Sequence, residues 1–300
     1  MKHLIKYSIC LLMLGCALLT FIQTNQEAKQ ETGGYEKWEK LNSDVIKAIQ
    51  TGKYQEVTPM AKKNYQYALE NFGKEHPDTL NSLNNLALLY DYQGRYKKAE
   101  TLYKEILIVS EKVLGKEHPD TLISLNNLAF LYESQGRYKE AEPLFKEALQ
   151  LREKVLGKKH SDTLTSLINL SELYRRQGRY KEAEPLYKKS LQLSKQMLGK
   201  EHPNTLIHLN NLGALYGKQG LYKEAEALLK EVLQLSEKVM GIDHPNTLIS
   251  MNNLAVLYGK QGRYGEAEAL LKKILQLGEK KTGQRIPQTW IFIKIKSFYG

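Results

Sequence analysis

Residues 74–115 read KEHPDTLNSLNNLALLYDYQGRYKKAETLYKEILIVSEKVLG, and this pattern returns every 42 residues as far as residue 283. One histidine of the pattern keeps the step in all copies: His76, His118, His160, His202 and His244. A strict repeat of this length predicts a solenoid, because one unit cannot bury its apolar face alone and must stack on its neighbours. Solenoids mostly present binding surfaces, so the sequence directs attention to the surface that the repeats build.

The repeat also predicts the organisation of the chain. Five tandem units form a domain over 74–283: 74–115, 116–157, 158–199, 200–241 and 242–283. Residues 35–73 read as a degenerate first copy, because Gly52-Lys53-Tyr54 falls 42 residues before Gly94-Arg95-Tyr96. Residues 284–300 begin a degenerate half-repeat, and 23–34 form a linker. Atypical first and last units are expected, since they cap the stack.

The residue pattern within each unit predicts a pair of antiparallel helices. In the first unit, apolar residues at helical spacing run up to a break at Gly94 and resume until Gly115. Small Ala87 and Ala99 are expected where the two helices approach closely. A short polar side chain at the start of each first helix is expected to satisfy its exposed N–H groups: Asp78, Asp120, Asp162, Asn204 and Asn246.

The first 22 residues differ from the rest of the chain. Lys2 and Lys6 precede a mostly apolar run from Ile9 to Ile22, the pattern of a signal peptide. Three alternatives stay open: ordinary cleavage, an uncleaved membrane anchor, and lipidation at Cys16, which ends a segment resembling a bacterial lipoprotein site. All three predict an exported protein, in the periplasm, outside the cell or attached to a membrane by its N-terminus.

Charge and cysteine usage limit the function classes. Both cysteines, Cys10 and Cys16, lie in this leader, so no disulfide or thiolate metal site is expected in the repeats. The formal net charge is +11, or +9 once Lys2 and Lys6 are removed. This balance favours acidic partners. Much of the charge is expected on a solvated helix face, where Glu100 and Lys104 stand four residues apart and recur with the repeat.

Within each unit, Leu86-Ala87, Tyr90, Gly94, Tyr96, Ala99 and Tyr103 resemble the signature of the tetratricopeptide repeat. The 42-residue period, with Gly-Lys-Glu-His-Pro-Asp-Thr-Leu and Leu-Asn-Asn-Leu-Ala-x-Leu-Tyr, is similar to the repeats of kinesin light chains. The resemblance covers 210 of 300 residues. It implies an all-α fold in which antiparallel hairpins form a right-handed α-α superhelix. The exported N-terminus and the missing coiled coil argue against a motor light chain.

One asparagine recurs in the first helix of all five units: Asn85, Asn127, Asn169, Asn211 and Asn253. Asparagine is a poor helix former, so its repetition needs a reason. The resemblance implies an asparagine ladder on the concave face, whose amides pair with the backbone of an extended peptide. A primary amide suits this role because it offers both donors and an acceptor. The alternative is architectural: the amides bond to neighbouring helices and set the repeat geometry.

The positions beside this ladder vary more. A second asparagine precedes it in four units, Asn84, Asn126, Asn210 and Asn252, and Ile168 interrupts that row. Leu88, Phe130 and Tyr92 give the first two units an apolar lining. The last three units carry a basic row, Arg176, Lys218 and Lys260. This row predicts an acidic ligand by charge complementarity, although cations are also favoured near any helix C-terminus.

The repeats carry no recognisable catalytic motif. Equivalent histidines lie about a helix diameter apart, too far to share a zinc ion, so they are expected to hold the turn before each first helix. Neither a metal nor a cofactor is predicted, no phosphate loop is present, and no nucleic-acid recognition module appears. We therefore expect a non-enzymatic scaffold that binds an extended peptide of a protein partner.

The alternative from a different class is a structural element that forms homo-oligomers through its apolar C-terminus, residues 290–299. Light scattering of the chain with and without the residues after Gly283 discriminates the two hypotheses.

Overall fold

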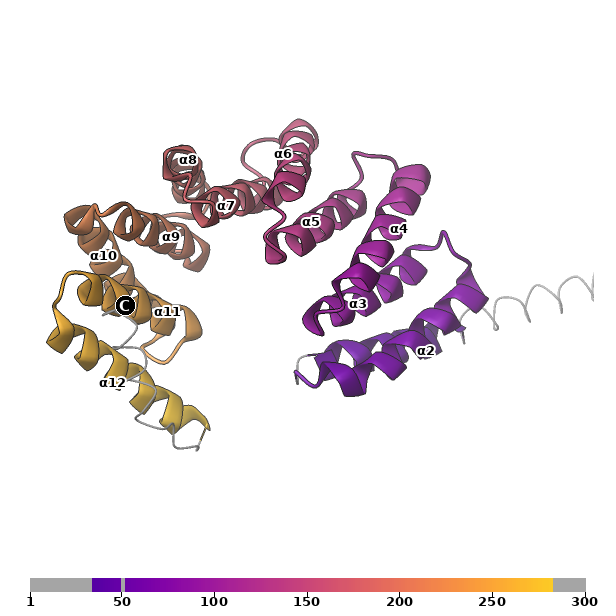
Figure 1. Ribbon diagram of the computed structural model, residues 1–300, viewed down its shortest axis with the longest axis horizontal. Helices are drawn as coiled ribbons and strands as arrows, with labels where there is room; N and C mark the ends of the chain where they lie inside the picture. Colours follow the sequence, from indigo (N-terminus) through magenta and orange to yellow (C-terminus); the bar gives the residue numbers. More distant parts are fainter. Residues whose placement is uncertain (1–33, 50–51, 283–300) are drawn as a thin grey trace, which may run out of the picture. The chain divides into compact units, whose positions relative to one another are not determined.

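The computed structural model describes residues 34–49 and 52–282, and this part is built of helices and turns without a strand (Figure 1). A first helix covers 34–49. The others are α2 (Tyr54–Phe72), α3 (Pro77–Tyr92), α4 (Tyr96–Leu114), α5 (Pro119–Ser134), α6 (Tyr138–Val155), α7 (Ser161–Arg176), α8 (Tyr180–Leu198), α9 (Pro203–Gln219), α10 (Tyr222–Met240), α11 (Pro245–Lys260) and α12 (Tyr264–Thr282). The leader with Cys16, the linker up to 33 and the expected half-repeat at 284–300 lie outside the described residues.

The helix starts differ from the prediction in one respect. The side chain that caps α3 is His76, whose Nδ1 accepts a hydrogen bond from the backbone N–H of Asp78 at 3.2 Å. The histidines of the other four units accept in the same way. The prediction that the Asp/Asn position caps the helix was therefore wrong. Asp78 lies in the first turn, where its charge favours the helix N-terminus. The expectation that the histidine holds this turn is confirmed.

The helix ends follow the glycines as predicted. Gly94 and Gly115 have φ values of 70° and 87°, a region that other residues rarely adopt. Gly94 lies in the tight turn between the two helices of a hairpin, and Gly115 caps the C-terminus of the second helix. Positive φ values recur at the equivalent glycines of the described residues: Gly136, Gly157, Gly178, Gly199, Gly220, Gly241 and Gly262.

The chain divides into two compact units at Leu131/Tyr132, within α5, and each is described here by itself. Unit 1 consists of the described residues up to 131, and unit 2 of those from 132 to 282. In both, a first helix packs against the second helix of its own hairpin and that of the preceding hairpin, as α9 packs on α10 and α8. In the repeat at 74–115, Ala87 and Ala99 are fully buried, as expected for closely approaching helices.

The charged face also agrees with the sequence. The five predicted Glu/Lys pairs form ion pairs at 2.7–2.8 Å: Glu100/Lys104, Glu142/Lys146, Glu184/Lys188, Glu226/Lys230 and Glu268/Lys272. All the lysines of these pairs are solvent-exposed, so each pair stabilises its own helix by only about 0.2–0.5 kcal/mol.

Candidate functional site

The predicted asparagine ladder has an architectural role in unit 1. The Nδ2 of Asn127 in α5 donates to Oδ1 of Asn84 in α3 at 2.8 Å, which joins two consecutive hairpins. The Nδ2 of Asn85 donates in the same way to Oδ1 of Asn42 at 2.9 Å. Asn126 is buried and donates to the carbonyl of Leu122 in its own helix. In unit 1, Asn84, Asn85 and Asn127 thus bond to neighbouring helices, which is the architectural role that the sequence left open as the alternative to peptide binding.

The ladder is interrupted in unit 2, where position 168 is an isoleucine. Asn211 therefore has no amide 43 residues before it. Asn211, Asn252 and Asn253 are half-buried and make no hydrogen bond within the described residues. Asn210 is buried, and its Oδ1 has no partner in the part of the chain that the structure describes. Asn169 is half-buried. The asparagines of α9 and α11 thus lack the bonds to a neighbouring hairpin that Asn85 and Asn127 make.

A groove of about 450 Å³ lies over these amides in unit 2, between α7, α9 and α11. We call it the unit 2 groove; its lining includes Glu172, Arg176, Asn211, Lys218, Asn253 and Lys260. Room for it comes from small residues of α9, Gly213, Ala214 and Gly217. A Cβ at Gly213 would lie 2.9 Å from Cδ2 of Leu229 in α10, so the second helix packs tightly behind the groove.

Arg176, predicted to attract an acidic ligand, is already paired. Its Nε lies 3.1 Å from a carboxylate oxygen of Glu172 and 3.1 Å from Oε1 of Glu133, the latter an ion pair without hydrogen-bond geometry. Glu172 also accepts from Arg175 and, at 2.8 Å, from the hydroxyl of Tyr187. Burial alone would raise the pKa of Glu172, but these bonds outweigh it and hold the pKa below its usual value. Part of the charge of Arg176 is therefore matched by carboxylates of the chain itself, unlike that of the other two residues of the basic row.

Lys218 and Lys260 remain as cations at the rim of the groove. Lys260 donates to the carbonyl of Gly217 at 3.2 Å, which is the contact expected of a cation near a helix C-terminus. Burial, and then the neighbouring Lys218, lower the pKa of Lys260. Neither lysine forms an ion pair with any described residue. The two ammonium groups thus repel each other, and an anion between them would relieve the repulsion.

The corresponding face of unit 1 is aromatic. Tyr92 is 51% exposed and stacks on Tyr54 with ring centroids 4.5 Å apart. Phe130 is also exposed. The apolar lining expected for the first two repeats is therefore available on this unit.

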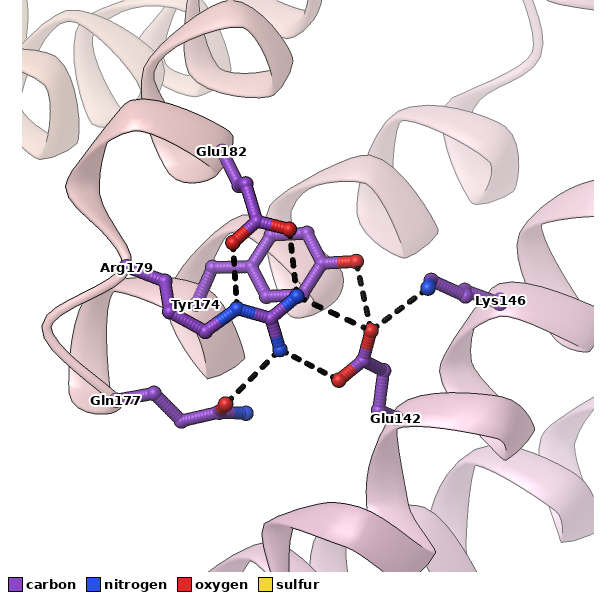
Figure 2. Close-up of polar contacts among 6 residues, drawn as sticks. All are labelled: Glu142, Lys146, Tyr174, Gln177, Arg179 and Glu182. Atoms are coloured by element: carbon purple, nitrogen blue, oxygen red, sulfur yellow. Dashed lines mark hydrogen bonds and ion pairs between the residues drawn. The ribbon is translucent and has the colours of Figure 1, made fainter.

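A polar cluster that the sequence analysis missed joins successive hairpins (Figure 2). The guanidinium of Arg179 donates to Glu142 at 2.6 Å and to Glu182 at 2.5 and 2.6 Å, and it lies 4.2 Å from the ring centre of Tyr174. We call this arrangement the arginine clamp. Bonds from Arg179 are the main reason that the pKa of Glu142 falls to about 2. The signal was present in the sequence, because an arginine follows the repeat tyrosine by five residues in four of the five units.

Replacing Arg179 by leucine is expected to lower the free energy of unfolding by about 1–2 kcal/mol, because charge-assisted bonds to two carboxylates are lost at a partly exposed site. Urea unfolding followed by circular dichroism measures the change. Arg95→Leu is the matched control, since Arg95 lies over Tyr90 but forms no ion pair within the described residues. An equal loss in both variants would contradict a contribution from the carboxylates.

Among the described residues, no group of three or more histidine, cysteine or acidic side chains is placed to hold a metal ion. No helix within 34–49 or 52–282 has the length and apolar character to cross a bilayer.

Antiparallel hairpins of this kind, stacked in series around a groove, define an α-helical repeat scaffold. The tetratricopeptide repeat model matches residues 48–107, 92–154, 120–196, 162–238 and 204–280, and the chain belongs to this family. The all-α fold class predicted from the sequence, that of proteins whose hairpins stack into right-handed superhelices, is therefore confirmed. Members of this class are binding scaffolds in general.

Solved structures define the type of repeat. The chain is 30% identical to the nearly identical repeats of a kinesin light chain from Podosopora anserina, over 70% of this chain and 100% of that one, with a TM-score of 0.60. Its repeats are therefore of the kinesin-light-chain-like type. BtubC from P. vanneervenii is 18% identical over 83% of this chain and 94% of its own, with a TM-score of 0.59.

The quorum sensor NprR of B. thuringiensis, in complex with its cognate peptide NprX, is similar in fold as well. It is 19% identical over 81% of this chain and 67% of its own length, with a TM-score of 0.55. No match was found among curated protein sequences.

Proposed function

We propose that this protein is a protein–protein interaction scaffold that binds an extended, acidic segment of a partner in the unit 2 groove. The observation that carries the proposal is the meeting of two unpaired lysines, Lys218 and Lys260, with the free amides of Asn211 and Asn253 along one groove. Such amides can pair with a peptide backbone without demanding a sequence, whereas the lysines select for negative charge. Peptide binding by NprR, which shares the fold, supports the proposal.

Among the five ladder asparagines, we assign the peptide contacts to Asn211 and Asn253, because both line the unit 2 groove and make no hydrogen bond within the described residues. Neighbouring first helices lie about 8–10 Å apart, and an extended chain advances about 3.3 Å per residue. Asn211 and Asn253 can therefore meet two peptide groups about three residues apart. An acidic residue of the same segment would reach toward the lysines about two helical turns away, because Lys218 and Lys260 follow these asparagines by seven residues.

The test uses the full chain and two blocked hexapeptides, one of alternating leucine and aspartate and one of alternating leucine and asparagine. The acidic peptide is expected to bind more tightly and to weaken with salt. Replacing Lys218 and Lys260 together by glutamate is expected to weaken the acidic peptide by about tenfold or more, equivalent to about 1.4 kcal/mol, and to spare the neutral one. Isothermal titration calorimetry measures both.

The matched control is the pair Lys181→Glu and Lys223→Glu, which changes the net charge equally at exposed positions outside the groove. A second variant, Asn211→Ala with Asn253→Ala, is expected to weaken both peptides, because it removes contacts to the backbone. Equal binding of the two peptides, or an equal effect of the control pair, would overturn the acidic specificity.

We also propose that the protein is exported, on the basis of the leader at residues 1–22. Cell fractionation of the tagged chain, compared with the Cys16→Ser variant, separates the three alternatives. Lipidation predicts that the variant leaves the membrane fraction, cleavage predicts a shortened chain in both, and an anchor predicts a membrane-bound chain in both.

A further inference from the structure

The arginine clamp has the same composition in two hairpins of unit 2, α7/α8 and α11/α12. In hairpin α7/α8, Arg179 fills it as described above, and Gln177 completes it by accepting a hydrogen bond from Nη1 at 3.0 Å. Hairpin α11/α12 repeats the geometry. There Arg263 donates to Glu226 and Glu266 at 2.6 Å and to Gln261 at 2.7 Å, over the ring of Tyr258. The guanidinium is thus surrounded by two carboxylates, an amide oxygen and an aromatic face.

Hairpin α9/α10 keeps the residues that surround the guanidinium in the other two hairpins but lacks the arginine itself. Glu184, Tyr216, Gln219 and Glu224 stand at the equivalent positions, but residue 221 is a leucine. The carboxylate of Glu224 makes no hydrogen bond or ion pair within the described residues, whereas Glu182 and Glu266 each hold an arginine. The side chain of Glu184 is 27% exposed, compared with 19% and 20% for Glu142 and Glu226.

The side-chain amide of Gln219 is oriented differently from that of Gln177, because no guanidinium lies beside it. Its Nε2 donates to Oε2 of Glu184 at 3.0 Å, the oxygen equivalent to the one that Arg179 contacts on Glu142. Its Oε1 is buried and lacks a partner among the described residues. In the two complete clamps this oxygen accepts from the arginine. A buried acceptor without a hydrogen bond costs about 1–3 kcal/mol, so the site is unsatisfied as it stands.

The lysine on Glu184 does not fill the position. Lys188 contacts Oε1 of Glu184 at 2.8 Å, and the equivalent Lys146 contacts Glu142 at 2.7 Å in a clamp that holds Arg179 at the same time. A guanidinium could therefore enter beside Lys188. It would displace the amide of Gln219 from Glu184, and Oε1 of Gln219 would then accept a hydrogen bond from the guanidinium, as Oε1 of Gln177 does from Arg179.

We propose that Glu184, Tyr216, Gln219 and Glu224 form a receptor for an arginine side chain of a partner protein. The guanidinium would take the place that Arg179 and Arg263 fill within the chain, and Leu221, which is 40% exposed, would pack against the methylene groups of the arginine. None of these residues lines the unit 2 groove, so this is a second contact surface. Arginine is the suitable cation because only its planar fork matches two carboxylates and an aromatic face together.

The test titrates the full chain with Nα-acetyl-L-arginine amide and follows the side-chain amide resonance of Gln219 by NMR. Nα-acetyl-L-citrulline amide is the neutral isostere, and Nα-acetyl-L-lysine amide is the point charge. The arginine probe is expected to give a saturable shift, with the lysine probe at least threefold weaker and the citrulline probe without saturation.

Two variants make the result decisive. Leu221→Arg fills the position from within the chain, so it is expected to raise the midpoint of thermal unfolding and to abolish the response to the arginine probe. Arg263→Leu, or Arg179→Leu if the first variant is unfolded, opens an equivalent position and is expected to make Gln261 or Gln177 respond as well. The inference is overturned by an absence of saturation in the unaltered chain, an equal response to citrulline, or an undiminished response in Leu221→Arg.

Discussion

Tyr187→Ala is expected to lower the free energy of unfolding by about 3–5 kcal/mol, the cost of emptying a large aromatic site in a core that cannot collapse around it. Tyr187 is fully buried in α8, and its ring forms part of the wall behind the unit 2 groove. Its hydroxyl donates to Glu172, so the change also removes one of the bonds that keep this half-buried carboxylate ionised. Urea unfolding at pH 7, followed by circular dichroism, measures the loss.

Tyr187→Phe separates the two contributions. Phenylalanine occupies this position in the hairpin α5/α6, where Phe145 is fully buried. The variant keeps the ring and removes only the bond to Glu172, which is worth about 1.5–3 kcal/mol for a charged partner. If alanine cost no more than phenylalanine, the ring would not be packed as the structure describes.

The fold was predictable because the same pattern of apolar, small and glycine residues recurs in five units. A glycine at each end of the second helix and small residues at each close approach leave few alternatives to stacked hairpins. The identity of the cap was not predictable from helix preferences, because Asp and Asn are better known caps than His. Only the geometry shows that Nδ1 of His76 reaches the N–H two residues further on, which places Asp78 inside the first turn.

The candidate site was predictable only in part, because the role of a repeated residue depends on its neighbour in the preceding hairpin. Asn127 and Asn211 occupy the same position in their units, yet Asn127 bonds to Asn84, whereas the residue 43 positions before Asn211 is Ile168, which has no amide. Arg176 illustrates the same point for charge, since it forms an ion pair with Glu133 from the previous hairpin. A sequence read one unit at a time does not reveal such pairs, but comparison of residues 43 positions apart does.

A comparison at a spacing of 37 residues would likewise have found the arginine clamp and its exception at Leu221. Stacked hairpins bring position 142 beside position 179, and 226 beside 263. Among the four repeats from 116 to 283, only the third lacks the arginine while it keeps both carboxylates, and this exception identifies a surface whose unmet hydrogen bonds are available to another molecule.

His208 is expected to make the protein sensitive to mild acid. It replaces the serine of the other four units on α9, and it is 5% exposed, with Nδ1 3.1 Å from Oγ of Ser190. Burial lowers its pKa from 6.5 to about 4. Since the unfolded chain binds the proton more readily, stability is complete above about pH 6.5 and is lost as the pH falls toward 4. The full loss corresponds to about 3 kcal/mol.

The control is His208→Ser, which restores the residue found at Ser82, Ser124, Ser166 and Ser250. Its stability is expected to fall less than that of the unaltered chain between pH 6.5 and 4. The fall that remains comes from carboxyls with lowered pKa values, such as Glu142 and Glu226, which the unfolded chain protonates first, and it is common to both proteins. The difference between the two urea-unfolding curves, measured at each half pH unit, isolates the histidine. Parallel pH dependence in the two proteins would mean that His208 takes up its proton in the folded state, and therefore that α9 opens to water there. Because α9 also carries Asn211 and Lys218, the same opening would change peptide binding in the unit 2 groove over the same pH range.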